Sequence, residues 1–319
     1  MNDGEVYQKL IGDFVPPRVF DAHAHLFRSQ DVYGGAPSQS SSLPQIAGYA
    51  DWQSAQQSVL GKNAPGDGLF FAFPGIDMNL VASNEFVRNE IQAHPQSRAL
   101  MMIRPDLSPD DLHFDGAWAG FKVYHCFSGI EQTQDALIEQ YLPDWAWEIA
   151  HEREWVIMLH MVRQRSLADP ANSDYILDRC RRYPHARLIL AHAGRGFAGH
   201  HTAEGVARLR GLDNVYFDTS VVCEPVALFH ILKTFGAGRL LYGSDFPVSQ
   251  WRGKAITIGD GFYWIYEHDV DWSDWPLGKP TLVGIESLHA IKQAAQMLEL
   301  RDADIERIFY HNAVELLGA

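Results

Sequence analysis

The chain has 319 residues, of which 46% are hydrophobic and 21% are charged, a composition that is ordinary for a globular protein and argues against disorder. Its length lies within the range of single α/β barrels, so we predict one domain spanning residues 1–319. The formal net charge of −14, without a basic run that could act against it locally, argues against nucleic acid as a partner.

The cysteines and the amino-terminal residues bear on the compartment. Cys126, Cys180 and Cys223 are odd in number and widely spaced, which favours a reducing compartment and gives no zinc-ribbon spacing. Residues 1–15 lack a charged-then-apolar signal pattern, so we expect neither a secretory peptide nor a membrane span. These features predict a cytoplasmic protein without a membrane partner.

The most informative segment is residues 21–25, which read Asp-Ala-His-Ala-His and close an apolar run. A strand sends every second side chain to the same face, so His23 and His25 should point the same way. Zinc binds imidazole nitrogens at about 2.0 to 2.1 Å, and two such histidines can supply half of a four-coordinate shell. Taken alone, the pair is equally typical of surface or core histidines.

Three later polar residues, His160, His192 and Asp245, each follow a short apolar run. Near-continuous apolar runs that alternate with helical patterns indicate a parallel sheet covered on both faces, and a barrel of such units gathers all its strand ends at one rim. Residues from four distant segments would then meet at one point.

The number of strand candidates fits an α/β fold, a distorted (β/α)8 TIM barrel. Amphipathic stretches such as residues 83–94 and 173–183 separate most of the candidates. The eight predicted strands are residues 19–25, 69–73, 99–104, 120–124, 156–160, 188–192, 215–219 and 240–245.

Two connections are too long to be simple, residues 26–68 after the first strand and residues 246–284 after the eighth. We expect these insertions to form lids or specificity walls over the site. A serine-rich patch at residues 38–42 lies in the first insertion. Two closing helices, at residues 288–300 and at residues 302–317 with Asp302 as a cap, should seal the outer layer of the barrel.

Five short motifs occur in order along nearly the whole chain. They are Asp-Ala-His-Ala-His at 21–25, Leu-His at 159–160, Ala-His-Ala-Gly-Arg-Gly at 191–196, Tyr-Gly-Ser-Asp-Phe-Pro at 242–247 and Tyr-His-Asn-Ala at 310–313. Together they resemble the amidohydrolase superfamily, in the amidohydrolase-related branch that includes aminocarboxymuconate-semialdehyde decarboxylase-like proteins. The motifs are specific for the fold and the branch, and much less so for a substrate.

The resemblance implies a divalent metal at the carboxyl rim of the barrel, usually one Zn²⁺, with Mn²⁺ as an alternative. It implies His23, His25, His160 and Asp245 as metal ligands, with His192 beside the metal as a polarising or proton-handling residue.

These residue types suit hydrolysis for chemical reasons that do not depend on the family resemblance. A divalent cation lowers the pKa of bound water from 15.7 towards about 7. Asp245 could take a proton from the attacking water and deliver it to the leaving group, and His192 could stabilise a developing oxyanion. The alternatives are a helix cap for Asp245 and a capping or core histidine for His192.

Lys122 and Tyr124 share a face at the end of the fourth predicted strand. Some superfamily members have a carboxylated lysine there that bridges two metals, whereas the branch resembled here generally works with one. We therefore expect Lys122 to be a catalytic ammonium that pairs with a substrate carboxylate or oxyanion, with a solvent-facing lysine as the alternative. Tyr124 is a candidate for substrate binding.

Cations near the predicted rim favour a small anionic substrate, because arginine holds a carboxylate in a bidentate fork. The candidate substrate-binding arginines are Arg104, Arg163 and Arg195. For Arg165, a surface ion pair is the better expectation.

Three functions stay open. Metal-dependent hydrolysis of a small carboxylated ester, lactone or amide is favoured, because the rim offers activated water, an acid–base group and a polarising histidine. The second is non-oxidative decarboxylation of an aromatic or muconate-type acid at the same metal. The third is a silent barrel that binds a ligand or a partner through its tryptophan-rich insertions, although all ligand positions are filled. Exposed insertions and helices favour a homo-oligomer.

Overall fold

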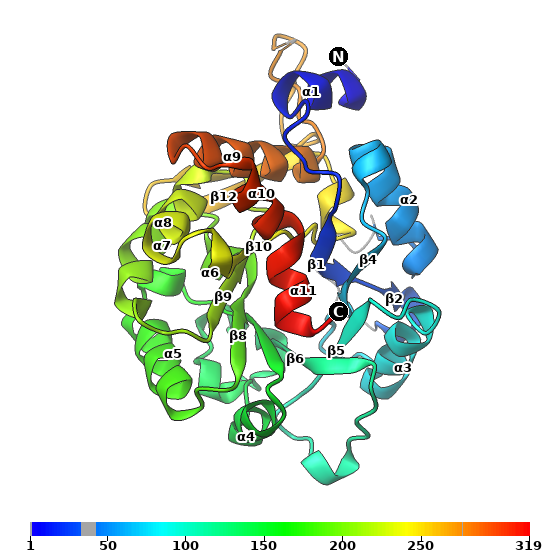
Figure 1. Cartoon of the computed structure of the whole chain (residues 1–319), viewed down its shortest axis with the longest axis vertical. Helices are drawn as coiled ribbons and strands as arrows, with labels where there is room; N and C mark the ends of the chain where they lie inside the picture. The colour runs from blue at the N-terminus through cyan, green and yellow to red at the C-terminus, as the bar shows by residue number, and fades with distance from the viewer. Residues whose placement is uncertain (1, 33–42, 276) are drawn as a thin grey trace.

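Eight parallel strands form one sheet in which each strand pairs with the next along the chain, in the order β1-β4-β5-β6-β7-β8-β9-β10 (Figure 1). The computed structural model describes residues 2–32, 43–275 and 277–319. The strands are β1 (Phe20–His25), β4 (Asp67–Phe71), β5 (Arg98–Met102), β6 (Trp118–Tyr124), β7 (Val156–His160), β8 (Arg187–Leu190), β9 (Val215–Asp218) and β10 (Leu240–Leu241).

The sheet closes through the segment that follows β10. Backbone amides of Ala22 and His25 donate to the carbonyl oxygens of Tyr242 and Phe246 at 2.8 and 2.9 Å, and the Asp245 amide donates to the His23 carbonyl at 2.7 Å. The predicted distorted (β/α)8 TIM barrel is therefore confirmed. Its eighth strand is shorter than predicted, because only its first two residues keep strand geometry.

Most of the helices lie on the outside of the sheet, and in the described residues no α-helix separates β5 from β6 (Figure 1). The helices are α1 (Asp3–Leu10), α2 (Tyr49–Leu60), α3 (Leu80–Glu90), α4 (Asp144–Arg153), α5 (Pro170–Arg182), α6 (Ala191–Arg195), α7 (Gly199–Val206), α8 (Pro225–Phe235), α9 (Val283–Met297), α10 (Asp302–Glu306) and α11 (Asn312–Leu317). The predicted helices at residues 83–94, 173–183 and 288–300 correspond to α3, α5 and α9. Local sequence explains their starts: in α5, the Asp169 carboxylate accepts from the Ala171 amide at 2.9 Å, and Pro170 occupies the first turn.

The end of the chain differs from the prediction in two ways. The helix expected at residues 302–317 is divided by a π-helical turn, Arg307–His311, and Arg301 rather than Asp302 is its capping residue. Helix α11 does not lie in the outer layer, because Ala313 and Leu316 join the cluster of barrel-interior side chains. The Arg187 side chain, at the start of β8, donates to the Leu316 carbonyl at 2.6 Å. Helix α11 therefore closes the amino-terminal end of the barrel.

Both predicted insertions carry their own structure. The first contains the short strands β2 (Phe27–Arg28) and β3 (Ile46–Ala47) before α2; the serine-rich patch at residues 38–42 lies outside the described residues. The second forms an antiparallel hairpin of β11 (Gly253–Ile258) and β12 (Gly261–Tyr266). Of the helices in the described ranges, none has the length and apolarity needed to cross a membrane.

Candidate metal centre

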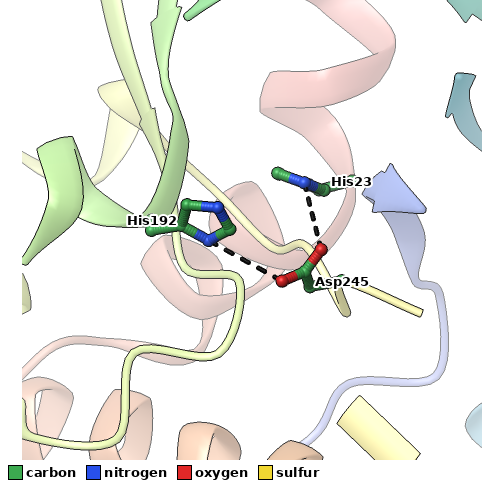
Figure 2. Close-up of side chains that lie close together, drawn as sticks. All are labelled: His23, His192 and Asp245. Atoms are coloured by element: carbon green, nitrogen blue, oxygen red, sulfur yellow. Dashed lines mark ion pairs between the residues drawn. The ribbon is translucent and has the colours of Figure 1, made fainter. Parts of the chain in front are cut away.

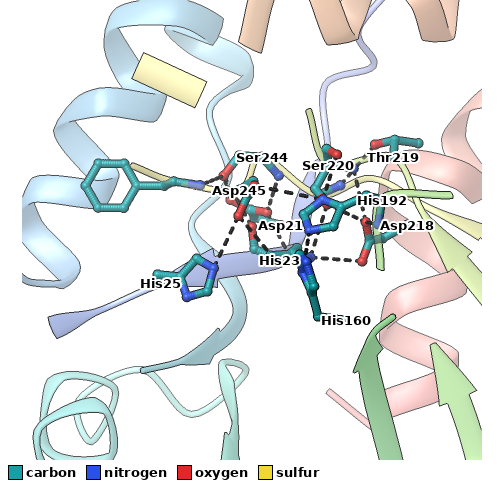
Figure 3. Close-up of polar contacts among 12 residues, drawn as sticks. Asp21, His23, His25, His160, His192, Asp218, Thr219, Ser220, Ser244 and Asp245 are labelled. Carbon is teal, nitrogen blue, oxygen red and sulfur yellow. Dashed lines mark hydrogen bonds and ion pairs between the residues drawn. The ribbon is translucent and has the colours of Figure 1, made fainter. Parts of the chain in front are cut away.

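Five predicted site residues meet at the carboxyl ends of the barrel strands (Figure 3). His23 and His25 alternate along β1, and His160 is the last residue of β7. His192 and Asp245 lie in the segments that follow β8 and β10. All five are buried, with His160 the most exposed at 8%.

Asp245 lies at the middle of this group. Its Oδ1 atom lies 3.3 Å from Nε2 of His23 and 3.2 Å from Nε2 of His25, and its Oδ2 atom lies 3.9 Å from Nδ1 of His192. His23, His192 and Asp245 each offer one ligand atom within 4.8 Å of the others (Figure 2). The carboxylate is thus surrounded by imidazoles on both of its oxygens.

The other nitrogens of the two β1 histidines are already occupied. Nδ1 of His23 lies 2.9 Å from Oδ2 of Asp218, and Nδ1 of His25 lies 3.0 Å from the Ala72 carbonyl oxygen. Because both partners are acceptors, each Nδ1 carries the proton, and each Nε2 of a neutral ring presents a lone pair to Oδ1 of Asp245. Lone pairs that face one another repel unless a cation lies between them.

This arrangement fits a divalent metal ion. Ligands held at about 2.0 to 2.1 Å in a tetrahedral shell lie about 3.3 Å apart, close to the 3.2 and 3.3 Å that join Asp245 to the two imidazoles. Nε2 of His23 is buried and has no hydrogen-bond partner among the residues described. The carboxylate and carbonyl behind the rings are the outer partners that orient metal-bound histidines.

The backbone at two of these residues is strained. His192 and Asp245 have φ of 54° and 58°, in the left-handed region that non-glycine residues rarely adopt. The Asp218 carboxylate supports the first of these turns, since its Oδ1 accepts from the amides of His192 and Ser220 at 2.8 and 3.1 Å. Such strain persists where the surroundings over-determine it, which is common at functional sites.

His160 contacts the group through His192. Its Nδ1 atom lies 3.1 Å from Nε2 of His192, and its ring stacks on Tyr124 with 4.2 Å between centroids. The family resemblance implies His160 as a ligand and His192 as a neighbour of the metal, whereas His192 lies within the compact group of ligand atoms and His160 lies against it. Their ligand roles stay predictions.

The charges of the centre favour a cation. Burial opposes ionisation of Asp245, but the imidazoles of His23, His25 and His192 outweigh it and hold the pKa of Asp245 well below its usual range. Burial lowers the pKa of His192 to about 4, so that ring is neutral at neutral pH. Burial and Lys122 act to lower the pKa of His23, yet the carboxylates of Asp218 and Asp245 raise it overall. A proton on His23 and a metal ion bound to it would each balance the negative charge of Asp218 and Asp245.

Lys122 is fully buried, which excludes the solvent-facing alternative. Its ammonium lies 4.5 Å from the centre of the Phe71 ring and has no hydrogen-bond partner in the described part of the chain. Burial lowers the pKa of Lys122 to about 8, against the opposing pull of Asp218 and Asp245. A desolvated ammonium therefore faces the same carboxylates as the imidazoles.

The predicted arginines fall into two groups. Arg104 and Arg163 form ion pairs with Asp106 and Asp169, with N–O distances of 3.2 and 2.7 Å. Arg195 instead donates to the amide oxygen of Gln134 at 2.8 Å. Its guanidinium lies 5.4 Å from the centre of the Phe262 ring. Arg165 forms the expected surface ion pairs, with Glu204 and Asp260.

Several polar residues that hold the centre were not predicted. Asp218 ends β9, and a strand was expected there, so the rule that identified His160 would also have found this carboxylate. Asp21 accepts from Nε1 of Trp52 at 2.8 Å and from the Ser244 amide at 2.8 Å, which ties α2 and the segment after β10 to β1. No sequence signal links those partners before the fold is known.

Histidines and an aspartate gathered at the carboxyl rim of a (β/α)8 barrel are typical of metal-dependent barrel enzymes. The chain belongs to the amidohydrolase family, since the family model described as Amidohydrolase matches residues 20–319. Membership confirms the predicted resemblance and the prediction of an enzyme. A comparison with curated proteins gave no match.

Solved structures share the fold at low identity. One is an amidohydrolase from Burkholderia multivorans with bound zinc, 14% identical, with a TM-score of 0.61 over 94% of this chain and 99% of that one. A probable 2-pyrone-4,6-dicarboxylic acid hydrolase from Acinetobacter baumannii with citric acid bound is 15% identical, with a TM-score of 0.57 and coverage of 94% and 99%. A 5-carboxyvanillate decarboxylase from Sphingomonas paucimobilis is 14% identical, with a TM-score of 0.59 and coverage of 95% and 99%.

Proposed function

We propose that the protein is a metal-dependent hydrolase that acts on a small carboxylated ester, lactone or amide. The observation that carries this proposal is the convergence of two imidazole Nε2 atoms, from His23 and His25, on Oδ1 of Asp245 at 3.3 and 3.2 Å. The Nδ1 atoms of both rings are bound to acceptors. A divalent cation held by these residues, with Zn²⁺ the first candidate and Mn²⁺ the second, supplies Lewis-acid activation of water.

Asp245 is proposed as the acid–base group. It is ionised at neutral pH, because the neighbouring imidazoles hold its pKa well below the usual range against the effect of burial. An ionised carboxylate beside the attacking water can accept its proton and return it to the leaving atom. His192 is proposed as a proton-handling residue beside the metal, because its Nδ1 faces the Ser220 carbonyl oxygen at 3.1 Å and the Nε2 atom of its neutral ring is left to accept a proton.

Two cations near the centre, the buried Lys122 and the partly buried Arg195, support an anionic substrate. Arg195 forms no ion pair with a carboxylate in the ranges described, and burial lowers the pKa of its guanidinium. Lys122 has no hydrogen-bond partner among those residues. A bound carboxylate can supply the negative partner that a desolvated cation lacks. We therefore propose Arg195 and Lys122, with Tyr124 beside them, as the groups that bind the substrate carboxylate or a developing oxyanion.

Arg104 and Arg163 have weaker claims to this role. Each already binds an aspartate, so a substrate carboxylate would have to displace that partner. We keep both as candidates for the outer part of the substrate site.

Decarboxylation is the second candidate function. The rings of Phe71 and Phe73 flank His25, with centroid distances of 4.7 and 5.0 Å. An apolar wall beside the centre suits an aromatic acid. Low polarity also favours the movement of negative charge from the carboxylate onto the ring carbon as carbon dioxide leaves, and that carbon is then protonated.

The deciding experiment is a substrate panel with the metal-loaded protein. We expect proton release from carboxylated lactones, esters or amides, loss of activity on chelation, and recovery with Zn²⁺ or Mn²⁺. His25→Ala should abolish activity, whereas the matched control His113→Ala, at an exposed histidine, should keep it. Carbon dioxide release from aromatic or muconate-type acids without hydrolysis would favour the second function, and full activity without metal would overturn both.

A separate variant tests the substrate class. Arg195→Gln should raise KM for a carboxylated substrate by about tenfold or more, because the guanidinium is partly buried and binds an amide oxygen rather than a carboxylate. Arg210→Gln, at an exposed arginine outside the proposed substrate site, is the matched control and should change KM little. Equal KM values for Arg195→Gln and the unaltered protein would remove Arg195 from the substrate site.

A further inference from the structure

A second histidine–carboxylate cluster lies where the start of α7 meets the turn between β11 and β12. His200 and His201 come from α7, and Asp260 occupies the hairpin turn. Nε2 of His200 lies 3.0 Å from Oδ1 of Asp260, and Nε2 of His201 lies 3.3 Å from the same oxygen. The three ligand atoms lie within 4.8 Å of one another.

The carboxylate is held so that one oxygen faces the histidines. Nε of Arg165 lies 3.1 Å from Oδ2 of Asp260, while Nη2 of Arg165 is 3.5 Å from Oδ1. The same guanidinium binds Glu204 at 2.8 Å, one helical turn after His200. Arg165 therefore fixes the direction of the Asp260 carboxylate, and the charge of Glu204 balances the arginine.

One member of the cluster is fully buried although the cluster opens to solvent. The His201 side chain is 0% exposed, whereas Asp260 is 65% exposed. Nδ1 of His201 has no hydrogen-bond partner among the residues that the structure describes, so the ring is positioned by packing and directs its Nε2 atom at Asp260. The site is thus rigid on the helix side and accessible from the hairpin side.

We propose that His200, His201 and Asp260 bind a second divalent transition-metal ion of the Zn²⁺ class. Ligand atoms of a tetrahedral zinc site lie about 3.3 Å apart. The separation of His201 from Asp260 is 3.3 Å, and that of His200 from Asp260 is 3.0 Å, a hydrogen-bond length. The ion would replace the proton between each ring and the carboxylate, with a small increase in the second distance. Two imidazoles and one carboxylate suit zinc and similar borderline ions, whereas Ca²⁺ and Mg²⁺ prefer oxygen ligands throughout.

This ion would pin the hairpin over the barrel mouth. Phe262 and Trp264 of β12 contact Phe197, with centroid distances of 5.0 and 5.4 Å, and Phe197 lies 5.3 Å from the His192 ring. A metal at the hairpin turn therefore fixes the element whose aromatic side chains back the candidate metal centre, and connects a surface site to that centre through packing.

The test is equilibrium dialysis of the full-length chain against Zn²⁺, with metal content measured per chain. We expect two ions in the unaltered protein. Asp260→Asn should weaken one of them by at least about tenfold, since loss of even an outer partner costs that much. Asp274→Asn, at an exposed carboxylate of the same insertion, should keep both ions.

Two further measurements separate this site from the candidate metal centre. His25→Ala should remove one ion and leave the ion that depends on Asp260. The second site can therefore be tested even if the protein has no hydrolase activity. With Zn²⁺ bound, amide hydrogens of residues 253–266 should exchange more slowly in the unaltered protein than in Asp260→Asn. Two ions retained by both Asp260→Asn and His200→Asn, or no ion besides the one lost in His25→Ala, would overturn the proposal.

Discussion

Asp218 shows how single residues outside the predicted ligand set control the candidate metal centre. It binds Nδ1 of His23 at 2.9 Å and the His192 amide at 2.8 Å. Burial acts to raise its pKa, but the charges and hydrogen bonds of His23 and its neighbours lower the pKa of Asp218 to about 2. The carboxylate is therefore ionised and fixes both histidines.

Asp218→Asn should weaken Zn²⁺ binding at the centre by about 10 to 100-fold, because the amide is a weaker acceptor for the His23 ring. Isothermal titration of the metal-free protein measures this change. The matched control, Asp144→Asn, alters an exposed carboxylate that pairs with Arg179 and contacts none of the ligand histidines and should leave the affinity unchanged. Equal affinities for the two variants would contradict the role given to Asp218.

Lys122 is a residue whose burial costs stability. Its pKa falls from 10.5 to about 8, mainly through desolvation. This shift corresponds to about 3 kcal/mol. The folded protein holds the ammonium unfavourably below pH 8, and the cost disappears as pH rises towards 10.5, because only the unfolded chain still binds the proton there.

Lys122→Met should therefore raise the free energy of unfolding of the metal-free protein at pH 7 by about 3 kcal/mol, as an upper value, while abolishing activity. Urea unfolding at pH 7 and pH 10 measures the difference, which should shrink at the higher pH. Lys62→Met, at an exposed lysine, is the control and should change stability little at either pH. A large loss of stability in Lys122→Met at pH 7 would show that the ammonium is satisfied in the fold.

At the scale of elements, the pairing of β5, β6 and β7 depends on Gly120. The register of β5 against β6 shifts between Ala99 and Leu100, and Gly120 follows this irregularity with φ of 151°. A Cβ atom at Gly120 would lie 1.8 Å from the Val156 carbonyl oxygen. The neighbouring strand therefore leaves no room for a side chain.

Gly120→Ala should destabilise the protein by at least about 3 kcal/mol, because β6 and β7 would have to separate. The midpoint of thermal or urea unfolding gives the change. Gly116→Ala has open space around its new methyl group and should shift stability by less than about 0.5 kcal/mol. If both substitutions were tolerated equally, β6 would not pack on β7 as described.

Element order was predictable from sequence because apolar runs and helical periods repeat along the chain. All eight predicted strands overlap observed ones, and the strand at residues 156–160 matches β7 residue for residue. Strand ends were less predictable at functional positions: the segments at His192 and Asp245 leave strand geometry for left-handed turns. Local propensity does not indicate such turns, since tertiary contacts such as those of Asp218 impose them.

The contacts that support the site were harder to predict from the sequence than its histidines. His23 and His25 share a face by strand alternation, a local rule. The links of Asp21 to Trp52 and Ser244 join segments that are remote in sequence, so they emerge only when the barrel closes. Likewise, α11 reads as an ordinary amphipathic helix, and its position across the barrel end depends on contacts with Arg98 and Arg187 at the starts of β5 and β8.

At the scale of the whole molecule, the candidate metal centre joins the beginning, middle and end of the barrel. His23 and His25 come from the first strand, His192 follows the sixth barrel strand, and Asp245 follows the last. The sheet closes at the same place, through hydrogen bonds between β1 and the segment around Asp245. An ion bound there would cross-link β1 and the segment that follows β10. The strand β10 has only two residues, so by itself it joins these segments weakly.

Metal binding should therefore stabilise the entire fold. A ligand present at 100 times its Kd and bound only by the folded state adds about 2.7 kcal/mol, so saturating Zn²⁺ should raise Tm by about 5 °C in a protein of this size. Differential scanning calorimetry of the metal-free and metal-loaded protein checks this. His25→Ala should lose most of the increase, while Asp260→Asn, which leaves the candidate metal centre intact, should keep the larger part. An increase that persists in both His23→Ala and Asp245→Asn would mean that the stabilising ion binds elsewhere, because the first variant removes the Nε2 atom of His23 and the second removes the negative charge of Asp245.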